Sequence, residues 1–190
     1  MTAEPRPPSD LRDPPPPTPD ELRRALGAFA TGVTVITALD GGEPVGFACQ
    51  SFASVSLEPP LVLFCADRGG RTWPRIRAAG RFCVNVLGED QEEVCLRFGS
   101  SKGAKFEGLE WDRSRWGAPA LRGVLARVHA DIRDVHAAGD HDVVIGLVRE
   151  LETPSDARPL IFFRSGFGVD RREPPAVPAA DLWAWGDHWG

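Results

Sequence analysis

The stretch "EPVGFACQSFASVSLEPPLVLFC", residues 43–65, decides the fold. It begins as a strand, passes through a run of small and hydroxyl side chains, is interrupted by two prolines, and resumes as an apolar strand. Because serines seldom line a protein core, Ser51, Ser54 and Ser56 indicate that something polar lies against this run. The alternative is an interior strand whose hydroxyls bond back to the main chain.

The segments around this stretch predict further strands in hairpin succession. VTVITAL (33–39) is rich in β-branched residues and leads through the turn DGGE into the returning strand PVGFACQ. No series of strand, helix and strand carries a glycine fingerprint, which disfavours a Rossmann fold. Roughly seven strands and three helices instead predict a mainly β protein, a closed antiparallel barrel with helices at its rim. Further strands are expected at 81–87, 124–137, 142–152 and 159–164, helices at 71–80 and 89–99, and loops over 100–123.

The first helix has a complete start signal. Thr18 is suited to the N-cap, Pro19 to the first helical position, and Glu21 completes a capping box. The helix carries one apolar stripe, formed by Leu22, Ala25, Leu26 and Phe29.

Composition sets the organisation and excludes some classes of function. The 190 residues suit one domain, predicted over 18–170, with a disordered proline-rich arm at 1–17 and a Pro/Trp-rich tail at 171–190. A net charge of −5 argues against nucleic-acid and membrane partners. The four cysteines form no C-x-x-C pair and no zinc-like spacing with histidine, so buried free thiols and no metal are expected. Without a signal peptide or a bilayer-length apolar run, a cytoplasmic protein is expected.

Two short motifs are candidates for chemistry. GGRTWP places Gly69, Gly70, Arg71 and Thr72 at a helix start, where free N–H groups, a guanidinium and a hydroxyl could bind a phosphate; the alternative is a plain N-cap with a solvated arginine. PVGFACQSFAS offers backbone amides, an amide side chain and a hydroxyl to a flat heteroaromatic ring.

A third candidate, GDH (139–141), forms a turn in which Asp140 could orient His141, although a histidine in such a turn is more often simply solvated.

Taken together, these motifs resemble the flavin reductase-like family of FMN-binding split β-barrels. The resemblance runs from about Glu21 to Gly168 and rests on the order of FATGVTVITA, the stretch quoted above, RFCVNVL, RFGSSKGAKFEG and GDH. It is strongest with the small reductase components of two-component flavin-dependent monooxygenases of actinobacterial type. The resemblance implies an antiparallel Greek-key split β-barrel that forms a homodimer, with flavin bound near the subunit interface.

The same resemblance implies a set of cofactor contacts. Gly46 and Ala48, being small, are expected to let the flavin ring approach the main chain. The implied flavin contacts are Pro44, Val45, Gly46, Phe47, Ala48, Gln50 and Ser51 along the ring and ribityl chain, Cys65, Ala66 and Asp67 in the same pocket, Arg71 and Thr72 at the phosphate, and Arg97, Phe98 and Lys105 closing the site. The implied NAD(P)H contacts are His141, Arg164, Ser165, Gly166 and Phe167.

The function implied is an NAD(P)H:flavin oxidoreductase. It would reduce FAD or FMN by hydride transfer, with NADH favoured over NADPH, and supply reduced flavin to a separate oxygenase, an aromatic hydroxylase of catabolism or natural-product biosynthesis. Because the cofactors carry this chemistry, no nucleophile or triad is required. Two alternatives stay open: a non-enzymatic flavin-binding or electron-carrier protein on the same fold, and an interaction protein that uses the proline-rich arm and the Trp-rich tail.

Overall fold

The computed structural model describes residues 15–168, so nearly all of the predicted arm and the whole of the predicted tail lie outside the described residues. The described part is mainly β, with three helices and twelve strands, and every strand pair is antiparallel. The predicted fold class is therefore confirmed at this level. Among these residues no helix has the length and apolar character needed to cross a bilayer.

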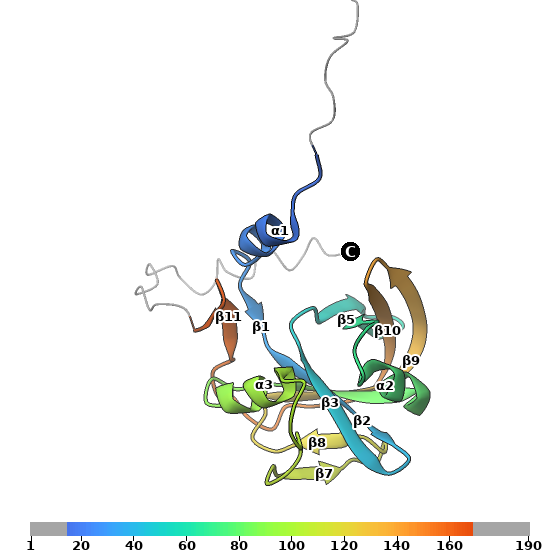
Figure 1. Cartoon of the computed structure of the whole chain (residues 1–190). Coiled ribbons are helices and arrows are strands. Elements are labelled where there is room, and N and C mark those ends of the chain that lie inside the picture. Colours follow the sequence, from blue (N-terminus) through green and yellow to red (C-terminus); the bar gives the residue numbers. More distant parts are fainter. Residues whose placement is uncertain (1–14, 169–190) are drawn as a thin grey trace, which may run out of the picture.

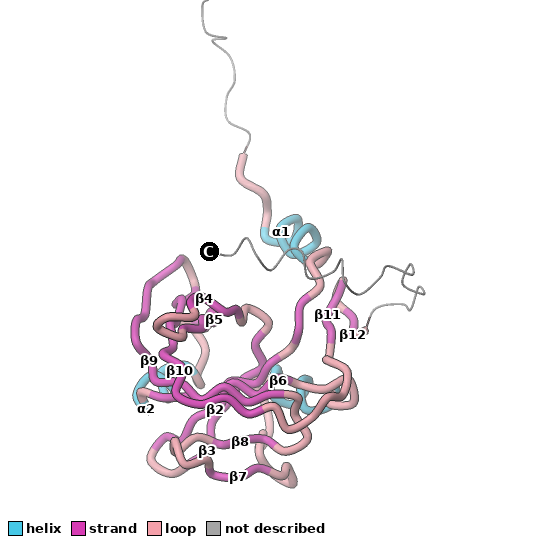
Figure 2. The backbone as a smooth tube through the Cα atoms, turned by 180° about the vertical axis from the view of Figure 1, so that it is seen from behind, coloured by secondary structure: helices cyan, strands magenta, loops and turns pink. Residues whose placement is uncertain are grey.

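A seven-stranded sheet in the order β3-β2-β6-β9-β10-β5-β4 forms the body of the molecule. It is strongly curved, so that its two ends approach each other (Figures 1 and 2). Its strands, in chain order, are β2 (Thr34–Asp40), β3 (Glu43–Cys49), β4 (Ala53–Ser56), β5 (Leu61–Asp67), β6 (Arg81–Val86), β9 (Ala126–Ala138) and β10 (His141–Glu152).

Two tight hairpins set the register of this sheet. Gly41 and Gly42 join β2 to β3 with φ angles of 59° and 95°, which glycine adopts without a steric penalty. Gly139, with φ of 65°, and Asp140 join β9 to β10 in the turn predicted from GDH. Both predicted turns are confirmed.

Strand β2, next to the edge strand β3, is buried on both faces, because alternate side chains enter two different clusters. Ile36 and Ala38 belong to a cluster inside the curve of the sheet, and Val33, just before the strand, and Val35 belong to one on the other face. The first cluster is covered by α2 (Trp73–Ala79) and the second by α3 (Glu92–Gly99).

The helices depart from the predictions in three respects. The capping box at Thr18 is present and opens α1 (Pro19–Leu26), but the apolar stripe of this helix is exposed, with Phe29 just beyond it 75% exposed. Thr72 precedes α2 without making a side-chain cap hydrogen bond, whereas Gly80 ends that helix with φ of 72° as expected. Helix α3 begins at Glu92, three residues after the start of the predicted segment 89–99.

Short strands complete the structure. β1 (Thr31–Gly32), β11 (Ile161–Phe163) and β12 (Gly166–Phe167) form a small sheet beside α1 (Figure 1), so the strand predicted at 159–164 is shorter than expected. β7 (Trp111–Arg113) and β8 (Pro119–Leu121) pair within a segment predicted as loop. Three-residue strands are too short to show a clear sequence period, so the sequence pattern does not predict them.

The close packing of β10 against β6 generates a stability prediction. A Cβ atom on Gly146 would lie 2.5 Å from Cζ of Phe82, whose ring is buried and cannot move aside easily. Gly146→Ala should therefore lower the free energy of unfolding by about 1–3 kcal/mol, measured by urea denaturation. Gly32→Ala is the control, since nothing lies within 4 Å of its added Cβ. Equal stability of the two variants would contradict this account.

Candidate functional site

A cavity of about 730 Å³ opens between β3, the end of β5, the start of α2 and the loop after α3. Such a volume is within the range of cofactor-binding pockets. Three separate parts of the chain, β3, the junction of β5 with α2, and the loop after α3, meet here because β3 lies at an edge of the sheet and leaves room for the loop to fold over it. The lining residues that were predicted as flavin contacts are Pro44, Val45, Gly46, Phe47, Ala48, Asp67, Arg71, Thr72, Phe98 and Lys105.

Three cationic residues, Arg71, Arg75 and Lys105, line this cavity, and Arg75 is paired with Asp40 (2.6 Å). The Lys105 ammonium donates hydrogen bonds to the carbonyl oxygens of Gly46 (3.2 Å) and Phe98 (2.9 Å). Arg71 donates to the carbonyl oxygen of Ser101. Burial, and to a smaller extent the neighbouring Arg71 charge, lowers the pKa of Lys105 below its ordinary value. An ammonium has three donors and a guanidinium five, so both groups keep donors with which to bind an anion.

The packing around Gly46 gives a structural reason for a glycine at this position. A Cβ atom there would lie 2.9 Å from both the Ile36 carbonyl oxygen and Cε1 of Phe98. The space beside this glycine is therefore filled by the Phe98 ring, which is itself 1% exposed and stacks edge-on against Phe106. The absence of a side chain at Gly46 thus leaves room for Phe98, which packs the end of α3 against β3, and because Gly46 also lines the cavity, its predicted approach to a flavin ring stays a prediction.

At Ser51 the structure agrees with the second interpretation of the serine run, in which the hydroxyls bond back to the main chain. Its hydroxyl accepts a hydrogen bond from the Cys65 amide (2.9 Å) and lies 3.3 Å from the Cys65 carbonyl, to which it donates. This pair joins the segment after β3 to β5. Ser51 and Cys65 are not among the residues that line the cavity, and neither are exposed Gln50 and fully buried Ala66.

Arg97 is not among the residues that line the cavity either. Its guanidinium donates to the Glu107 carbonyl (2.8 Å) and pairs with Glu93 one helical turn earlier (3.3 Å). Because Glu107 does line the cavity, Arg97 braces the loop that forms one wall of it.

The predicted nicotinamide residues fall in two places. His141 opens β10 and pairs in register with Asp67, which lines the cavity, so the histidine lies at the cavity's edge. Its Nδ1 atom lies 2.8 Å from Oδ1 of Asp140, the orientation that the GDH turn predicted. The hydrogen bond with His141, and then its charge, lowers the pKa of Asp140.

The second group, 164–167, lies in the β11–β12 hairpin, which α1 and β1 adjoin (Figure 1). None of these four residues lines the cavity. Arg164 and Ser165 both have positive φ angles, 48° and 65°, and the Arg164 amide donates to the Gly27 carbonyl (2.9 Å). Within one chain, the structure therefore does not bring this hairpin together with the other predicted cofactor residues.

The sequence analysis missed much of one cavity wall. This wall is the loop after α3, and its glycine, serine and lysine residues include Lys105, one of only two lysines in the chain. The concentration of those residue types was the signal that could have found it. Gly70, which belongs to the predicted phosphate-binding motif, lines the cavity as well, and the unpredicted lining residues are Glu43, Trp73, Arg75, Gly99, Ser100, Ser101, Gly103, Ala104, Phe106 and Glu107.

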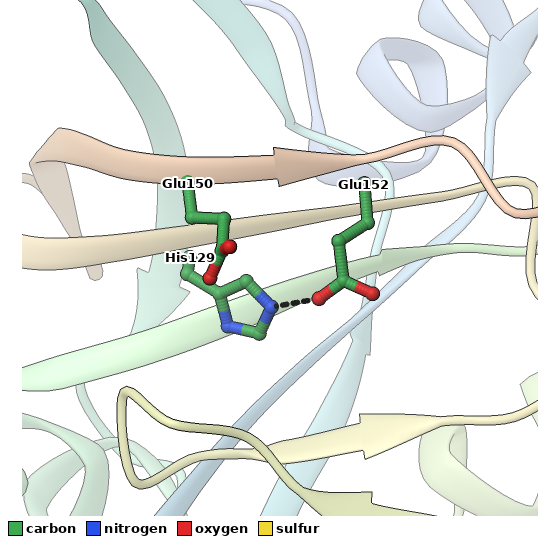
Figure 3. Close-up of side chains that lie close together, drawn as sticks. All are labelled: His129, Glu150 and Glu152. Carbon is green, nitrogen blue, oxygen red and sulfur yellow. Dashed lines mark hydrogen bonds and ion pairs between the residues drawn. The ribbon is translucent and has the colours of Figure 1, made fainter.

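A second polar cluster lies on the neighbouring strands β9 and β10 (Figure 3). Ligand atoms of His129, Glu150 and Glu152 lie within 4.8 Å of one another, an arrangement that depends on the β9–β10 register and was not predicted. The buried His129 ring hydrogen-bonds to Glu152 (2.8 Å). Arg127 pairs with Glu152 and Arg115 with Glu150, so the cluster is an ion-pair network with its charges already compensated.

Comparison with known proteins agrees with this geometry. The model of the "Flavin reductase like domain" family matches residues 26–169. The reductase subunit HsaB of a flavin-dependent monooxygenase from Rhodococcus jostii is 48% identical over 164 residues, which cover 86% of this chain and 84% of HsaB.

Two solved structures are similar in both fold and sequence. Nitrilotriacetate monooxygenase component B from Mycobacterium thermoresistibile has a TM-score of 0.77 and 47% identity, over 85% of this chain and 92% of its own. The NADH:FAD oxidoreductase SgcE6 of Streptomyces globisporus, solved with NAD and FAD fragments, has a TM-score of 0.76 and 34% identity, over 84% and 94% of the two chains. The chain belongs to the flavin reductase-like domain family.

Proposed function

We propose that this protein is an NAD(P)H:flavin oxidoreductase whose product, reduced flavin, is consumed by a separate flavin-dependent monooxygenase. The observation that carries the proposal is the cationic pair Arg71 and Lys105 at the wall of a cofactor-sized cavity, in a chain of the flavin reductase-like family. The names of its relatives support both the reduction of flavin and its use by a monooxygenase: SgcE6 is an NADH:FAD oxidoreductase, and HsaB is the reductase subunit of a monooxygenase. FAD or FMN and NADH are accordingly the expected substrates.

The residues of the cavity suit two substrates that carry their own redox chemistry. Hydride transfer from a nicotinamide to a flavin needs aligned rings and little acid–base catalysis. Arg71 and Lys105 would hold the flavin phosphate, and the open edge of β3 between Pro44 and Ala48 would offer main-chain groups to the ring. His141, held by Asp140, would contact the nicotinamide.

The five predicted flavin residues outside the cavity lining would act indirectly in this arrangement. Ser51 and Cys65 hold the junction of β3 with β5, and Arg97 braces the cavity loop. Gln50 and Ala66 adjoin these segments in the chain.

Catalytic turnover tests the proposal. Purified protein mixed with NADH and an excess of FAD or FMN in the absence of oxygen should bleach the 450 nm flavin absorbance through many turnovers, a wavelength at which oxidised flavin absorbs at roughly its maximum. Reduction of a single equivalent of co-purifying flavin would instead indicate an electron carrier. No reduction with either nicotinamide and with FAD, FMN or riboflavin would reject the function.

The phosphate assignment generates a prediction specific to the flavin. Arg71→Gln should raise KM for FMN and FAD by about tenfold or more, because a charge-assisted hydrogen bond to phosphate is lost, while KM for riboflavin, which has no phosphate, stays within about twofold. Arg133→Gln, an exposed arginine on β9, is the matched control. An equal effect of Arg71→Gln on all three flavins would mean that this arginine does not bind the phosphate.

We also propose that the curved sheet is a closed split barrel and that the chain forms a homodimer. The exposed stripe of α1, with Leu22, Leu26 and Phe29 between 48% and 75% exposed, supports the second point, because it has no apolar partner among the described residues. In such a dimer the β11–β12 hairpin, remote from its own cavity, could reach the cavity of the other subunit.

Sedimentation velocity tests the dimer. The wild-type protein should give a sedimentation-derived mass of twice its chain mass of 20.6 kDa. Phe29→Glu should produce monomers at micromolar concentration, because a charge placed in an apolar interface costs on the order of several kcal/mol. Leu151→Glu is the control, since Leu151 is 66% exposed but lies at the end of β10. A monomeric wild type, or a dimeric Phe29→Glu variant, would overturn the assignment.

A further inference from the structure

Asp142 is a buried carboxylate next to the proposed nicotinamide residue, and the function proposed above gives it no role. Its side chain is 8% exposed. The indole N–H of Trp73 donates a hydrogen bond to its Oδ2 atom at 2.8 Å, and Trp73 is itself 4% exposed. A buried carboxylate needs such partners, because desolvation penalises an uncompensated charge strongly.

The partners of Asp142 connect two separate parts of the cavity. Trp73 is the first residue of α2 and directly follows Arg71 and Thr72 at the cavity wall. Its ring also packs edge-on against Phe64 in the core, with centroids 6.0 Å apart. The position of Trp73 therefore determines where the chain that carries Arg71 enters the helix.

Arg68, which directly follows β5, makes further bonds to the hairpin that carries Asp142. Its Nε atom lies 3.6 Å from Oδ1 of Asp142, and its side chain also donates to the Gly139 carbonyl (3.3 Å). The Arg68 amide donates to the Asp140 carbonyl (3.0 Å). A second arginine, Arg77 of α2, lies 3.8 Å from Oδ2. The hairpin of His141 and the segment 67–73 are thus joined by hydrogen bonds of Arg68 to Gly139 and Asp140, and by side-chain contacts of Trp73 and Arg68 that meet at the Asp142 carboxylate.

We propose that Asp142 is a positioning residue that holds the phosphate-binding start of α2 and the nicotinamide-binding hairpin in one fixed relation. Successive side chains of a strand point to opposite faces, so His141 lies at the cavity's edge while Asp142 points into the core toward Trp73. Asp142 therefore acts on both substrates without touching either. This inference rests on the proposed function for its kinetic consequences but not for its structural ones.

Three variants separate the components of the connection. Asp142→Leu removes the acceptor and the charge, Asp142→Asn keeps an oxygen for the Trp73 N–H, and Trp73→Phe keeps an aromatic ring, smaller than the indole, but removes the donor. Asp142→Leu and Trp73→Phe should each raise KM for flavin and for NADH together, by about fivefold or more, with kcat within about threefold of wild type. Asp142→Asn should restore most of both KM values.

Two matched variants test whether the effect is specific. His141→Ala should raise KM for NADH alone. Asp131→Leu, which removes a carboxylate that is ion-paired to Arg149 at 2.7 Å elsewhere on the sheet, should leave both KM values within about twofold. The double variant Asp142→Leu/Trp73→Phe should be no worse than the more affected single variant, since both remove the same bond.

Hydrogen exchange provides a readout that does not need activity. Asp142→Leu and Trp73→Phe should speed amide exchange in 67–73 and 139–142 together by about fivefold or more, while His141→Ala should change neither segment. If the Asp142→Leu variant does not fold, the amide exchange rates of the Trp73→Phe variant test the proposal by themselves. Unchanged exchange in Trp73→Phe, a rise in only one of the two KM values, or additive effects in the double variant would overturn the proposal. A wild type without turnover would contradict only the proposed function.

Discussion

The cavity depends on one half-buried ammonium, that of Lys105. Among the described strands β3 is paired on one side only, so alternate carbonyl and amide groups along its other edge lack strand partners. Lys105 donates to one of these edge carbonyls, that of Gly46, and to the Phe98 carbonyl at the end of α3. These two hydrogen bonds hold the loop that carries Lys105 over the open edge of β3. They also place a positive charge in the resulting cavity.

The packing around this ammonium is equally restrictive. Phe98 fills the space that a side chain at position 46 would need, and Phe106, in the loop, stacks edge-on against Phe98 with centroids 5.0 Å apart. The glycine, the aromatic pair and the lysine therefore constrain one another, and a change in any of them would move the loop relative to β3. A cavity wall built in this way is more rigid than a loop held by its ends alone, which suits a site that must align two rings.

Whether a feature of the fold or site could be predicted from the sequence depends on how far apart in the chain the interacting residues lie. The β2–β3 and β9–β10 hairpins were predicted because a glycine-containing turn between alternating strands is a local signal, and Arg71 was identified by its place before a helix. The His129–Glu150 pairing, the role of Gly46 and the cavity loop depend on contacts between segments far apart in the chain. An amphipathic stripe predicts a buried face but not its partner, so the exposure of α1 could not be foreseen.

The serine run illustrates how one stretch can serve two purposes. Ser51 bonds both main-chain groups of Cys65 and so joins the end of β3 to β5 where the curved sheet turns back on itself. A hydroxyl is suited to this because it donates and accepts at once, and neither an aliphatic side chain nor a carboxylate could satisfy an amide and a carbonyl together. Ser54, by contrast, lies on β4, the exposed outer strand of the sheet, where a polar side chain discourages unwanted strand pairing. The Ser51 hydroxyl thus shapes the sheet that carries the cavity, whereas the cavity itself is lined by the neighbouring strand β3, by the cations Arg71, Arg75 and Lys105, and by Thr72, Ser100 and Ser101 from other segments.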